Sequence, residues 1–330
     1  MPGRYQAVLV LSFGGPEKND DVLPFLENVL RGRNVPRERM LEVAEHYHHF
    51  GGRSPINDQS RELIAALTHE LETCGPRLPV YWGNRNWHPL LADTLRRMES
   101  DGVRRALAFI TSAFGSYSGC RQYLEDIARA RAEVGPDAPV LDKLRGFHNH
   151  PGFIVAVADR VQAAFEQVPP DRRAPAGLLF TAHSIPAAMA PGSPYVDQLT
   201  ESCRLVAQAA GRKRYELVYQ SRSGPPSQPW LGPDIGDALR RFRELNGPGT
   251  DVIVSPIGFI SDHMEVLYDL DTEAARLART LDLNMIRAGT PGAHPKFVSM
   301  IRELIAAEAV WVCPPDCCPA PRRPGPSDQA

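Results

Sequence analysis

VIVSPIGFISDHMEVLYDLDTEA, residues 252–274, changes its hydrophobic pattern partway along. VIVSPIGF (252–259) is a short apolar run, the pattern of a strand that a parallel sheet buries on both faces. After it, Met264, Val266 and Leu270 recur at the spacing of an amphipathic helix. A buried strand followed directly by a helix is the repeating unit of an α/β protein, so this stretch predicts that fold class.

Short apolar runs alternate with amphipathic segments along most of the chain. Five further runs resemble buried parallel strands: AVLVLSF (7–13), PVYWG (79–83), ALAFITS (106–112), GLLFTAHS (177–184) and YELVYQS (215–221). The alternation predicts doubly wound parallel sheets. A loop near 145–151 divides the pattern, so we expect two Rossmann-like lobes, 1–149 and 150–308, with a cleft between them. The Cys- and Pro-rich end, 309–330, is expected to be an irregular tail.

The composition excludes several classes of protein. With 330 residues, of which 43% are hydrophobic, the chain can bury a large core. A formal net charge of −2 and the lack of a long basic run argue against nucleic-acid binding. No run approaches the ~18 apolar residues of a membrane-spanning helix, and the first residues make a poor secretory signal. These features predict a cytoplasmic protein.

The polar side of residues 261–274 carries a row of like charges. Asp262, Glu265, Asp269 and Glu273 follow one another at three- and four-residue spacing, with no Lys or Arg in the stretch. Carboxylates at this spacing repel one another, and a solvated helix face is the commonest explanation of a charge run. Because this row begins where a strand ends, it is also expected to face a cleft, where carboxylates bind a divalent cation or accept protons.

His183 ends another apolar run, LLFTAH, and a turn follows it. A hydrogen-bonded histidine at a strand end is the simpler explanation. An imidazole there is also well placed for proton transfer near neutral pH, and with the carboxylate row it would form a site through which a metal ion passes. A nucleotide or hydrolase site is not indicated, because GGPE (14–17) lacks the G-x-G-x-x-G spacing and G-x-S-x-G is absent.

Other strand ends carry aromatic and basic residues suited to a large, flat, anionic ligand. The candidates are Phe13, Tyr47, Trp87 and Trp230 for its faces, and Ser54, Arg85 and Arg222 for its carboxylates. Each of them, taken singly, is more common as an ordinary packing or surface residue.

Six segments together resemble the ferrochelatases, the enzymes that insert Fe²⁺ into a porphyrin. They are LVLSFGGPE (9–17), FGGRSPIN (50–57), YWGNRNWHP (81–89), FTAHSIP (180–186), LVYQSRSGPPSQPWLGPD (217–234) and PIGFISDHMEVLYDLD (256–271). The resemblance covers nearly the whole chain, from about residue 6 to about residue 308. It implies a lyase of haem biosynthesis, with a porphyrin and Fe²⁺ as substrates and transient contact with neighbouring enzymes of the pathway.

The resemblance also implies a catalytic pair. His183 matches the histidine that meets the porphyrin and takes part in pyrrole deprotonation and metal handling, and Glu265 matches the glutamate that faces it across the macrocycle. A porphyrin that is bent by its cleft exposes its nitrogens, and two N–H protons must leave as Fe²⁺ enters. Which residue takes which proton, and from which side iron arrives, are left open.

The remaining candidates match supporting positions of the family. Asp262 and His263 match residues around the catalytic pair, and Asp269 and Glu273 match an acidic path that delivers iron or removes protons. The positions that line the porphyrin cleft are matched by Phe13, Ser54, Arg85 and Trp230.

Four of the six cysteines resemble the ligands of [2Fe–2S]-bearing ferrochelatases. Cys120 matches the ligand from the body of those enzymes, and Cys313, Cys317 and Cys318 in VCPPDCCP match the three from the C-terminus. Four thiolates are what such a cluster needs. Because Cys317 and Cys318 are adjacent, one of them could be a bystander, and an unliganded tail is the alternative.

Coproporphyrin III is the expected porphyrin, with protoporphyrin IX as the alternative. The segment 31–50 is strongly charged and offers no contiguous apolar lip for a membrane-delivered substrate. Phe13 stands where the animal-type protoporphyrin enzymes carry methionine, and the motifs resemble actinobacterial, coproporphyrin-type enzymes. Two further hypotheses are a non-catalytic porphyrin or metal carrier and a cobalt or nickel chelatase of a related tetrapyrrole.

Overall fold

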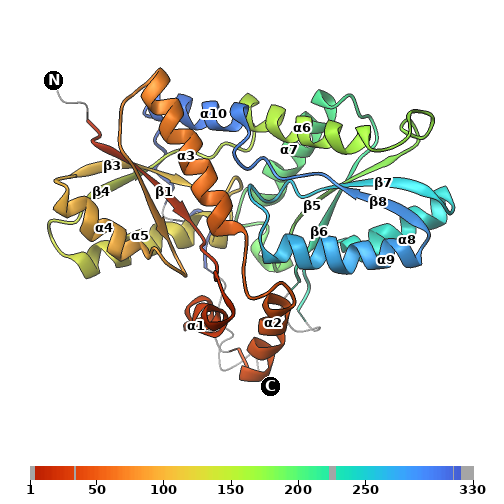
Figure 1. Ribbon diagram of the computed structural model, residues 1–330, viewed down its shortest axis with the longest axis horizontal. Coiled ribbons are helices and arrows are strands. Elements are labelled where there is room, and N and C mark those ends of the chain that lie inside the picture. The colour runs from red at the N-terminus through yellow and green to blue at the C-terminus, as the bar shows by residue number, and fades with distance from the viewer. Residues whose placement is uncertain (1–3, 33–34, 223–227, 315, 321–330) are drawn as a thin grey trace.

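Figure 1 presents the computed structural model, which describes residues 4–32, 35–222, 228–314 and 316–320. Two sheets of four parallel strands lie at opposite ends of the molecule, with helices around and between them. Among the described residues, no helix is long and apolar enough to cross a membrane. Of the predicted tail 309–330, residues 315 and 321–330 lie outside the described part, as does Ser223 of the motif 217–234.

The two sheets have the same strand order. The first, β2-β1-β3-β4, contains β1 (Ala7–Ser12), β2 (Val80–Asn84), β3 (Arg105–Ile110) and β4 (Val140–Lys143). The second, β6-β5-β7-β8, contains β5 (Gly177–His183), β6 (Glu216–Gln220), β7 (Thr250–Ser255) and β8 (Leu283–Arg287). The predicted α/β class and parallel sheets are therefore confirmed. In detail each order is the 2-1-3-4 arrangement of flavodoxin-like sheets rather than the 3-2-1-4 of a nucleotide-binding Rossmann half.

The helices between the strands cover both faces of each sheet. They are α1 (Asn19–Leu30), α2 (Arg37–His49), α3 (Ile56–Cys74), α4 (Leu91–Ser100), α5 (Gln122–Val134), α6 (Pro151–Glu166), α7 (Tyr195–Ala209), α8 (Ile235–Asn246), α9 (Ala275–Thr280) and α10 (Pro295–Ala306). Short 3₁₀ turns occur at Pro170–Arg172 and Ala187–Met189, and π-helices at Tyr117–Arg121 (η1) and Val266–Ala274 (η4).

Alternate residues of β1 show how one strand serves both faces. Leu9 and Leu11 belong to a core with α4 and α5, whereas Val8 and Val10 belong to a core with α3. All six residues of β1 are buried. A strand covered on both sides has no polar alternation, which is why it appears in the sequence as a continuous apolar run.

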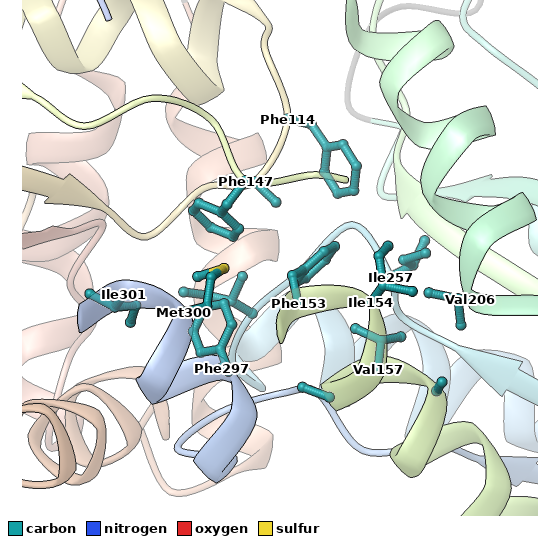
Figure 2. Close-up of a cluster of buried hydrophobic side chains, with 14 of the residues drawn as sticks. Phe114, Phe147, Phe153, Ile154, Val157, Val206, Ile257, Phe297, Met300 and Ile301 are labelled. Atoms are coloured by element: carbon teal, nitrogen blue, oxygen red, sulfur yellow. The ribbon is translucent and has the colours of Figure 1, made fainter. Parts of the chain in front are cut away.

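A single hydrophobic core joins the two sheets. It contains Phe109 of β3 from the first sheet and Phe180 of β5 from the second. Between them lie phenylalanines of the connecting loop and helices: Phe147 stacks on Phe109 with ring centroids 5.3 Å apart, and Phe153 of α6 packs edge-on against Phe147 at 5.6 Å. Figure 2 shows that Phe297 and Met300 of α10 extend the same cluster. The halves are thus fused by shared packing.

The C-terminal segment returns to the first half of the molecule. Helix α10 packs against both α3 and α6. Beyond it, the amide of Arg145 donates to the carbonyl of Ala309 (2.7 Å), and the amide of Trp311 donates to the carbonyl of Lys143 (3.1 Å). Residues after 308 therefore pair with the strand β4. The division into lobes 1–149 and 150–308 matches the two sheets but not this crossing, and as a domain boundary it stays a prediction.

The helix predicted for 261–274 differs from the structure in two ways. Helical structure begins at Met264, so Asp262 precedes the helix instead of lying on its face. From Val266 to Ala274 the backbone is a π-helix rather than an α-helix. Such i→i+5 helices are rare and are frequent at functional sites. The hydrophobic period alone did not distinguish the two helix types, because Val266, Leu270 and Ala274 are buried in this geometry too.

Candidate functional site

Strand order indicates where a ligand would bind in the second sheet. Connections from β5 and β7, which are neighbours, lead to opposite sides of the sheet, and ligands of doubly wound proteins bind at such a point, beyond the carboxyl ends of the strands. β5 ends at His183, and the chain leaving β7 runs through residues 256–263 into the helix that carries Glu265. Topology thus brings together two segments that are far apart in the sequence.

His183 presents one ring nitrogen to this site. Its Nδ1 lies 2.5 Å from the carbonyl oxygen of Ser184. A carbonyl can only accept, so this contact assigns the proton to Nδ1 and leaves Nε2 free to act as a base in the neutral ring. The hydroxyl of Tyr195 donates to the carbonyl of His183 (2.9 Å) and holds the end of the strand. The backbone on both sides of the imidazole is therefore fixed.

Glu265 faces that nitrogen. Its Oε1 lies 3.6 Å from Nε2 of His183, and the two side chains are 44% and 33% exposed. Solvent or a ligand can therefore reach both groups, but no macrocycle fits between two atoms 3.6 Å apart, so here the pair lies on one side of a flat ligand and not across it as expected. The amide of Glu265 donates to Nδ1 of His263 (3.1 Å), and Gln220 donates to the carbonyl of Glu265 (3.2 Å). These bonds hold the start of the helix against β6.

Asp269 continues from Glu265 into a more buried environment. It accepts hydrogen bonds from the hydroxyl of Ser221 and from Nε2 of Gln220 (3.4 Å). Burial, strengthened by the charges of Glu265 and Glu273, raises the pKa of Asp269 to about 7, although the Ser221 bond opposes the shift. A carboxyl with this pKa can hold or release a proton near neutral pH.

One arginine divides the predicted carboxylate row into two groups. Arg287, the last residue of β8, contacts Asp262 at 3.0 Å and Asp271 at 2.6 Å. These two carboxylates therefore share one positive charge within the protein, which compensates them in part. Among the described residues, no ion pair with Lys or Arg at Asp269 or Glu273 is found, and Glu265 has only His183 as its partner. Glu265, Asp269 and the exposed Glu273 thus form a line of uncompensated acids from the site to the surface.

His263 has a structural position next to this line. Its Nδ1 accepts from the backbone, its ring packs edge-on against Phe259 at 4.8 Å, and burial lowers its pKa. All three features favour the neutral imidazole. His263 and Asp262 therefore shape the loop that carries Glu265, and neither offers a free charge to a passing cation.

Phe13 and Arg85, predicted to line the cleft, lie together in the first half of the molecule. Phe13 follows β1 and packs edge-on against Phe25 at 6.2 Å. The guanidinium of Arg85 stands 5.8 Å from the Phe13 ring and 4.4 Å from the Tyr123 ring. Its Nε pairs with Asp126 at 2.5 Å, and both side chains are almost fully buried. The charge of Arg85 is thus matched inside the protein, which the sequence did not indicate.

Ser54 and Trp230 are also less open than the sequence suggested. Ser54 is 3% exposed, and its amide donates to the carbonyl of Pro16 (2.9 Å). A side chain at Gly15 would collide with Ser54 Cβ at 2.8 Å, so the Gly-Gly-Pro loop needs glycine to approach this serine. Trp230 forms a bridge with Pro186, just after His183. Its buried Nε1 has no hydrogen-bond partner among the described residues.

The four predicted cluster cysteines gather at one place. Cys120 Sγ lies 3.8 Å from Cys313 Sγ, and Cys317 Sγ lies 3.5 Å from Cys318 Sγ. Arg121 donates to the carbonyl of Cys317 (2.8 Å) and so holds the tail. Among the described residues, no three His, Cys, Asp or Glu side chains converge on a single metal position. The four cysteines therefore form two pairs of close sulfur atoms.

Two residues that sequence reasoning did not single out contribute to the site. Arg287 ends β8, and Gln59 of α3 binds Asp262. Arg287 stands at a strand end, so the rule that ligands bind there could have flagged it, as it flags Gln220 at the end of β6 and Ser221 just after it. Ser221 has φ = 62°, a left-handed conformation that is unusual outside glycine. Nothing in the sequence indicates the pairing of Gln59.

The comparisons with known proteins agree with this architecture. The sequence profile of the family described as Ferrochelatase matches residues 5–309. A protein of Rhodopirellula baltica named Ferrochelatase is 56% identical, covering 97% of this chain and 95% of its own. Proteins named Coproporphyrin III ferrochelatase from Nocardia farcinica and Streptomyces coelicolor are 51% and 47% identical. They cover 97% and 98% of this chain, and 98% and 95% of their own.

Solved structures share the fold at low identity. SirB from Bacillus subtilis with Fe³⁺ superimposes with a TM-score of 0.56 at 13% identity, covering 92% of this chain and 97% of its own. The sirohydrochlorin chelatase SirB with cobalt gives 0.52, also at 13% identity, covering 92% of this chain and 96% of its own. At this identity the likeness concerns the fold alone.

The raised pKa of Asp269 predicts a pH-dependent effect of Asp269→Asn. In the folded protein the buried carboxyl keeps its proton up to about pH 7, whereas in the unfolded chain it ionises near its ordinary pKa of 3.8, so its contribution to stability is lost between these two values. Asparagine does not ionise. The free energy of unfolding of the variant relative to that of wild type should therefore increase from about pH 4 to about pH 7 and then level off, as measured by urea denaturation.

Ser221→Gly is the matched variant, since it removes the hydroxyl that lowers the pKa of Asp269 while tolerating the positive φ. It should move the same pH transition upward. A difference between Asp269→Asn and wild type that is constant over the whole pH range would contradict the prediction.

Proposed function

The chain belongs to the ferrochelatase family, lyases that insert Fe²⁺ into a porphyrin in haem biosynthesis, and we propose that the porphyrin is coproporphyrin III and that His183 and Glu265 carry out the chemistry. The observation that supports this most directly is the 3.6 Å approach of His183 Nε2 to Glu265 Oε1 at the carboxyl ends of β5 and β7. A neutral imidazole nitrogen and a carboxylate, both accessible, are the groups that the removal of two pyrrole protons requires.

The proton balance fits this pair of residues. Insertion of Fe²⁺ into a free-base porphyrin forms four Fe–N bonds and releases two protons, so the site must accept both and pass them on. His183 Nε2 accepts one, while the Ser184 carbonyl holds the other side of the ring. Glu265 stands next to it, and Asp269, with its pKa of about 7, is suited to take a proton onward.

The line Glu265, Asp269, Glu273 is proposed as a path between solvent and the porphyrin centre. Glu273 is exposed, Asp269 is more buried, and Glu265 meets His183. Uncompensated carboxylates attract both Fe²⁺ and protons. Arg287 keeps Asp262 and Asp271 out of this path by pairing with them. The path can thus carry iron inward or protons outward.

Two observations support coproporphyrin III as the substrate. Relatives from Nocardia farcinica and Streptomyces coelicolor that bear the name Coproporphyrin III ferrochelatase are about half identical over nearly the whole chain. The exposed side of α2 is mostly charged or polar, and Leu41 is its one exposed aliphatic residue. A substrate with four propionates needs no apolar surface for delivery, in contrast to a poorly soluble porphyrin.

We also propose that Cys120, Cys313, Cys317 and Cys318 hold a [2Fe–2S] cluster. Two thiolates on one tetrahedral metal at about 2.3 Å lie about 3.8 Å apart. The pairs Cys120–Cys313 and Cys317–Cys318, at 3.8 and 3.5 Å, fit one iron each. This pairing includes both adjacent cysteines, and it explains why no three ligands converge on one point. When bound, such a cluster supplies one-electron chemistry and cross-links the tail to the body.

Burial and the neighbouring sulfurs raise the pKa of Cys313 to about 11 and that of Cys318 to about 12, so without a metal these thiols keep their protons, and binding a cluster would release them. Lys143 Nζ donates to Cys120 Sγ at 3.2 Å and lowers the pKa of Cys313. None of the six cysteines forms a disulfide, which supports a cytoplasmic location. Contact with neighbouring pathway enzymes stays a prediction.

His183→Ala should lower kcat for iron insertion by about 100-fold or more, the usual contribution of a general base. Glu265→Gln should also lower kcat, because it removes the second acceptor. Fluorescence quenching should show that both variants still bind porphyrin. His69→Ala, which changes an exposed histidine on α3, is the control and should leave kcat unchanged. Near-normal insertion by His183→Ala with intact binding would exclude the proposed role.

The choice of porphyrin predicts a higher kcat/KM for coproporphyrin III than for protoporphyrin IX. The measurement is steady-state Fe²⁺ insertion under anaerobic conditions, with both porphyrins dispersed in the same detergent. A clear preference for protoporphyrin IX would assign the protein to the other branch of the family and leave its catalytic pair unchanged.

Protein purified anaerobically should show visible absorbance of a [2Fe–2S] cluster together with acid-labile sulfide. Serine substitution of Cys120, Cys313, Cys317 or Cys318, made singly, should abolish both, because each sulfur is needed. Cys74→Ser and Cys203→Ser are controls, since these thiols lie outside the group. If Cys317→Ser or Cys318→Ser kept the cluster, that residue would be the bystander.

A further inference from the structure

Gln59, on the first turn of α3, connects the two halves of the molecule next to the candidate site. Its Oε1 accepts from the backbone amide of Asp262 at 2.8 Å, and its Nε2 lies 3.5 Å from Asp262 Oδ2. Gln59 belongs to the first half, whereas Asp262 lies near the end of the loop that leads from β7 to Glu265. We propose that Gln59 is a positioning residue for Glu265, acting across the boundary between the halves.

The loop that Gln59 holds is rigid up to Glu265. Arg287 binds the Asp262 carboxylate from β8, and the amide of Glu265 donates to the ring of His263 within the loop. The amide of Leu267 donates to the carbonyl of His263 at 3.0 Å. These bonds all come from the second half, so they fix residues 262–267 relative to the second sheet. Gln59 connects the same residues to the first half.

The first turn of α3 also holds the loop that follows β1. Asn57, two residues before Gln59, donates to the carbonyl of Gly15 (3.1 Å) and to the carboxylate of Glu17 (2.9 Å). This turn thus binds the Gly-Gly-Pro loop of the first half with one side chain and the Glu265 loop of the second half with the other. A flat ligand between the halves would have its two walls set by the same helical turn.

The packing around Gln59 leaves little room for a substitute. A cavity of about 10 Å³ is lined by Gln59, Ser12, Ser60, Thr111, Ser261 and their neighbours, which is space for about one water. If the glutamine acceptor were lost, the amide of Asp262 would have to find a new partner in this confined space, or the loop would have to shift. A shift of the loop moves Glu265 relative to His183 and to the opposite wall.

The test rests on the proposed function and compares Gln59→Leu with Gln59→Glu. Leucine removes the acceptor and should lower kcat for Fe²⁺ insertion by about 10- to 100-fold, the effect of misplacing a reacting group, with little change in KM for the porphyrin. Glutamate keeps an acceptor for the Asp262 amide but replaces the donor that faces Asp262 Oδ2 with a second carboxylate, so its kcat should lie between that of the leucine variant and that of wild type. Hydrogen exchange of residues 262–267 should rise in the leucine variant and rise less in the glutamate variant.

Gln198→Leu is the matched control. Gln198 of α7 also accepts a backbone amide across the halves, from Gly115 at 2.7 Å, but it does not touch the Glu265 loop. The Gln198→Leu variant should lower the Tm about as much as Gln59→Leu does, while kcat and the hydrogen exchange of residues 262–267 stay unchanged. Equal losses of kcat in both leucine variants, or normal exchange at 262–267 in Gln59→Leu, would overturn the proposal. If His183→Ala stayed active, the proposed chemistry would fail, yet exchange at 262–267 would still decide whether Gln59 holds the loop.

Discussion

The core that Phe109, Phe147, Phe153 and Phe297 build between the two sheets is the constraint on which the rest of the molecule depends. Close-packed side chains resist deformation, so this core fixes the two sheets relative to each other. The loop after β1 and the site at the ends of β5 and β7 are therefore held in a fixed position relative to each other. The chemistry proposed for His183 and Glu265 depends on that position, because the proposed planar substrate has to fit beside the pair.

One cation determines how the acidic segment works. Without Arg287, none of the carboxylates from Asp262 to Glu273 would have a positive partner among the described residues, and their mutual repulsion would destabilise the helix. By pairing with Asp262 and Asp271, Arg287 anchors the segment and leaves Glu265, Asp269 and Glu273 uncompensated. Electrostatic repulsion is thereby confined to the residues that can relieve it by binding a proton or Fe²⁺. The pKa of Asp269 is raised mainly by burial, and the charges of Glu265 and Glu273 add to this shift.

The sequence predicted the features that follow from local pattern, and it missed those that depend on long-range pairing. Six of the eight strands were visible as continuous apolar runs, although β2 and β6 are only partly buried, and His183 and Glu265 were recognisable from strand ends and family motifs. The edge strands β4 and β8 were missed, since VLDK and LNMIR are only partly buried and lack such a run. The π-helix, the burial of the Arg85–Asp126 pair and the Gln59 bond depend on partners distant in sequence, which periodicity cannot supply.

The return of the C-terminal segment to β4 bears on how the chain reaches its fold during synthesis. Domains generally fold as units, beginning with the N-terminal one while the ribosome is still at work. Here Phe297 and Met300 complete a core that includes residues of β1 and β3, and the backbone of Ala309 and Trp311 pairs with β4. The part of the first half that α10 covers stays exposed until that helix has been made. The two sheets should therefore reach their native packing only once α10 is available, and until then the nascent chain exposes apolar surface that a chaperone can bind.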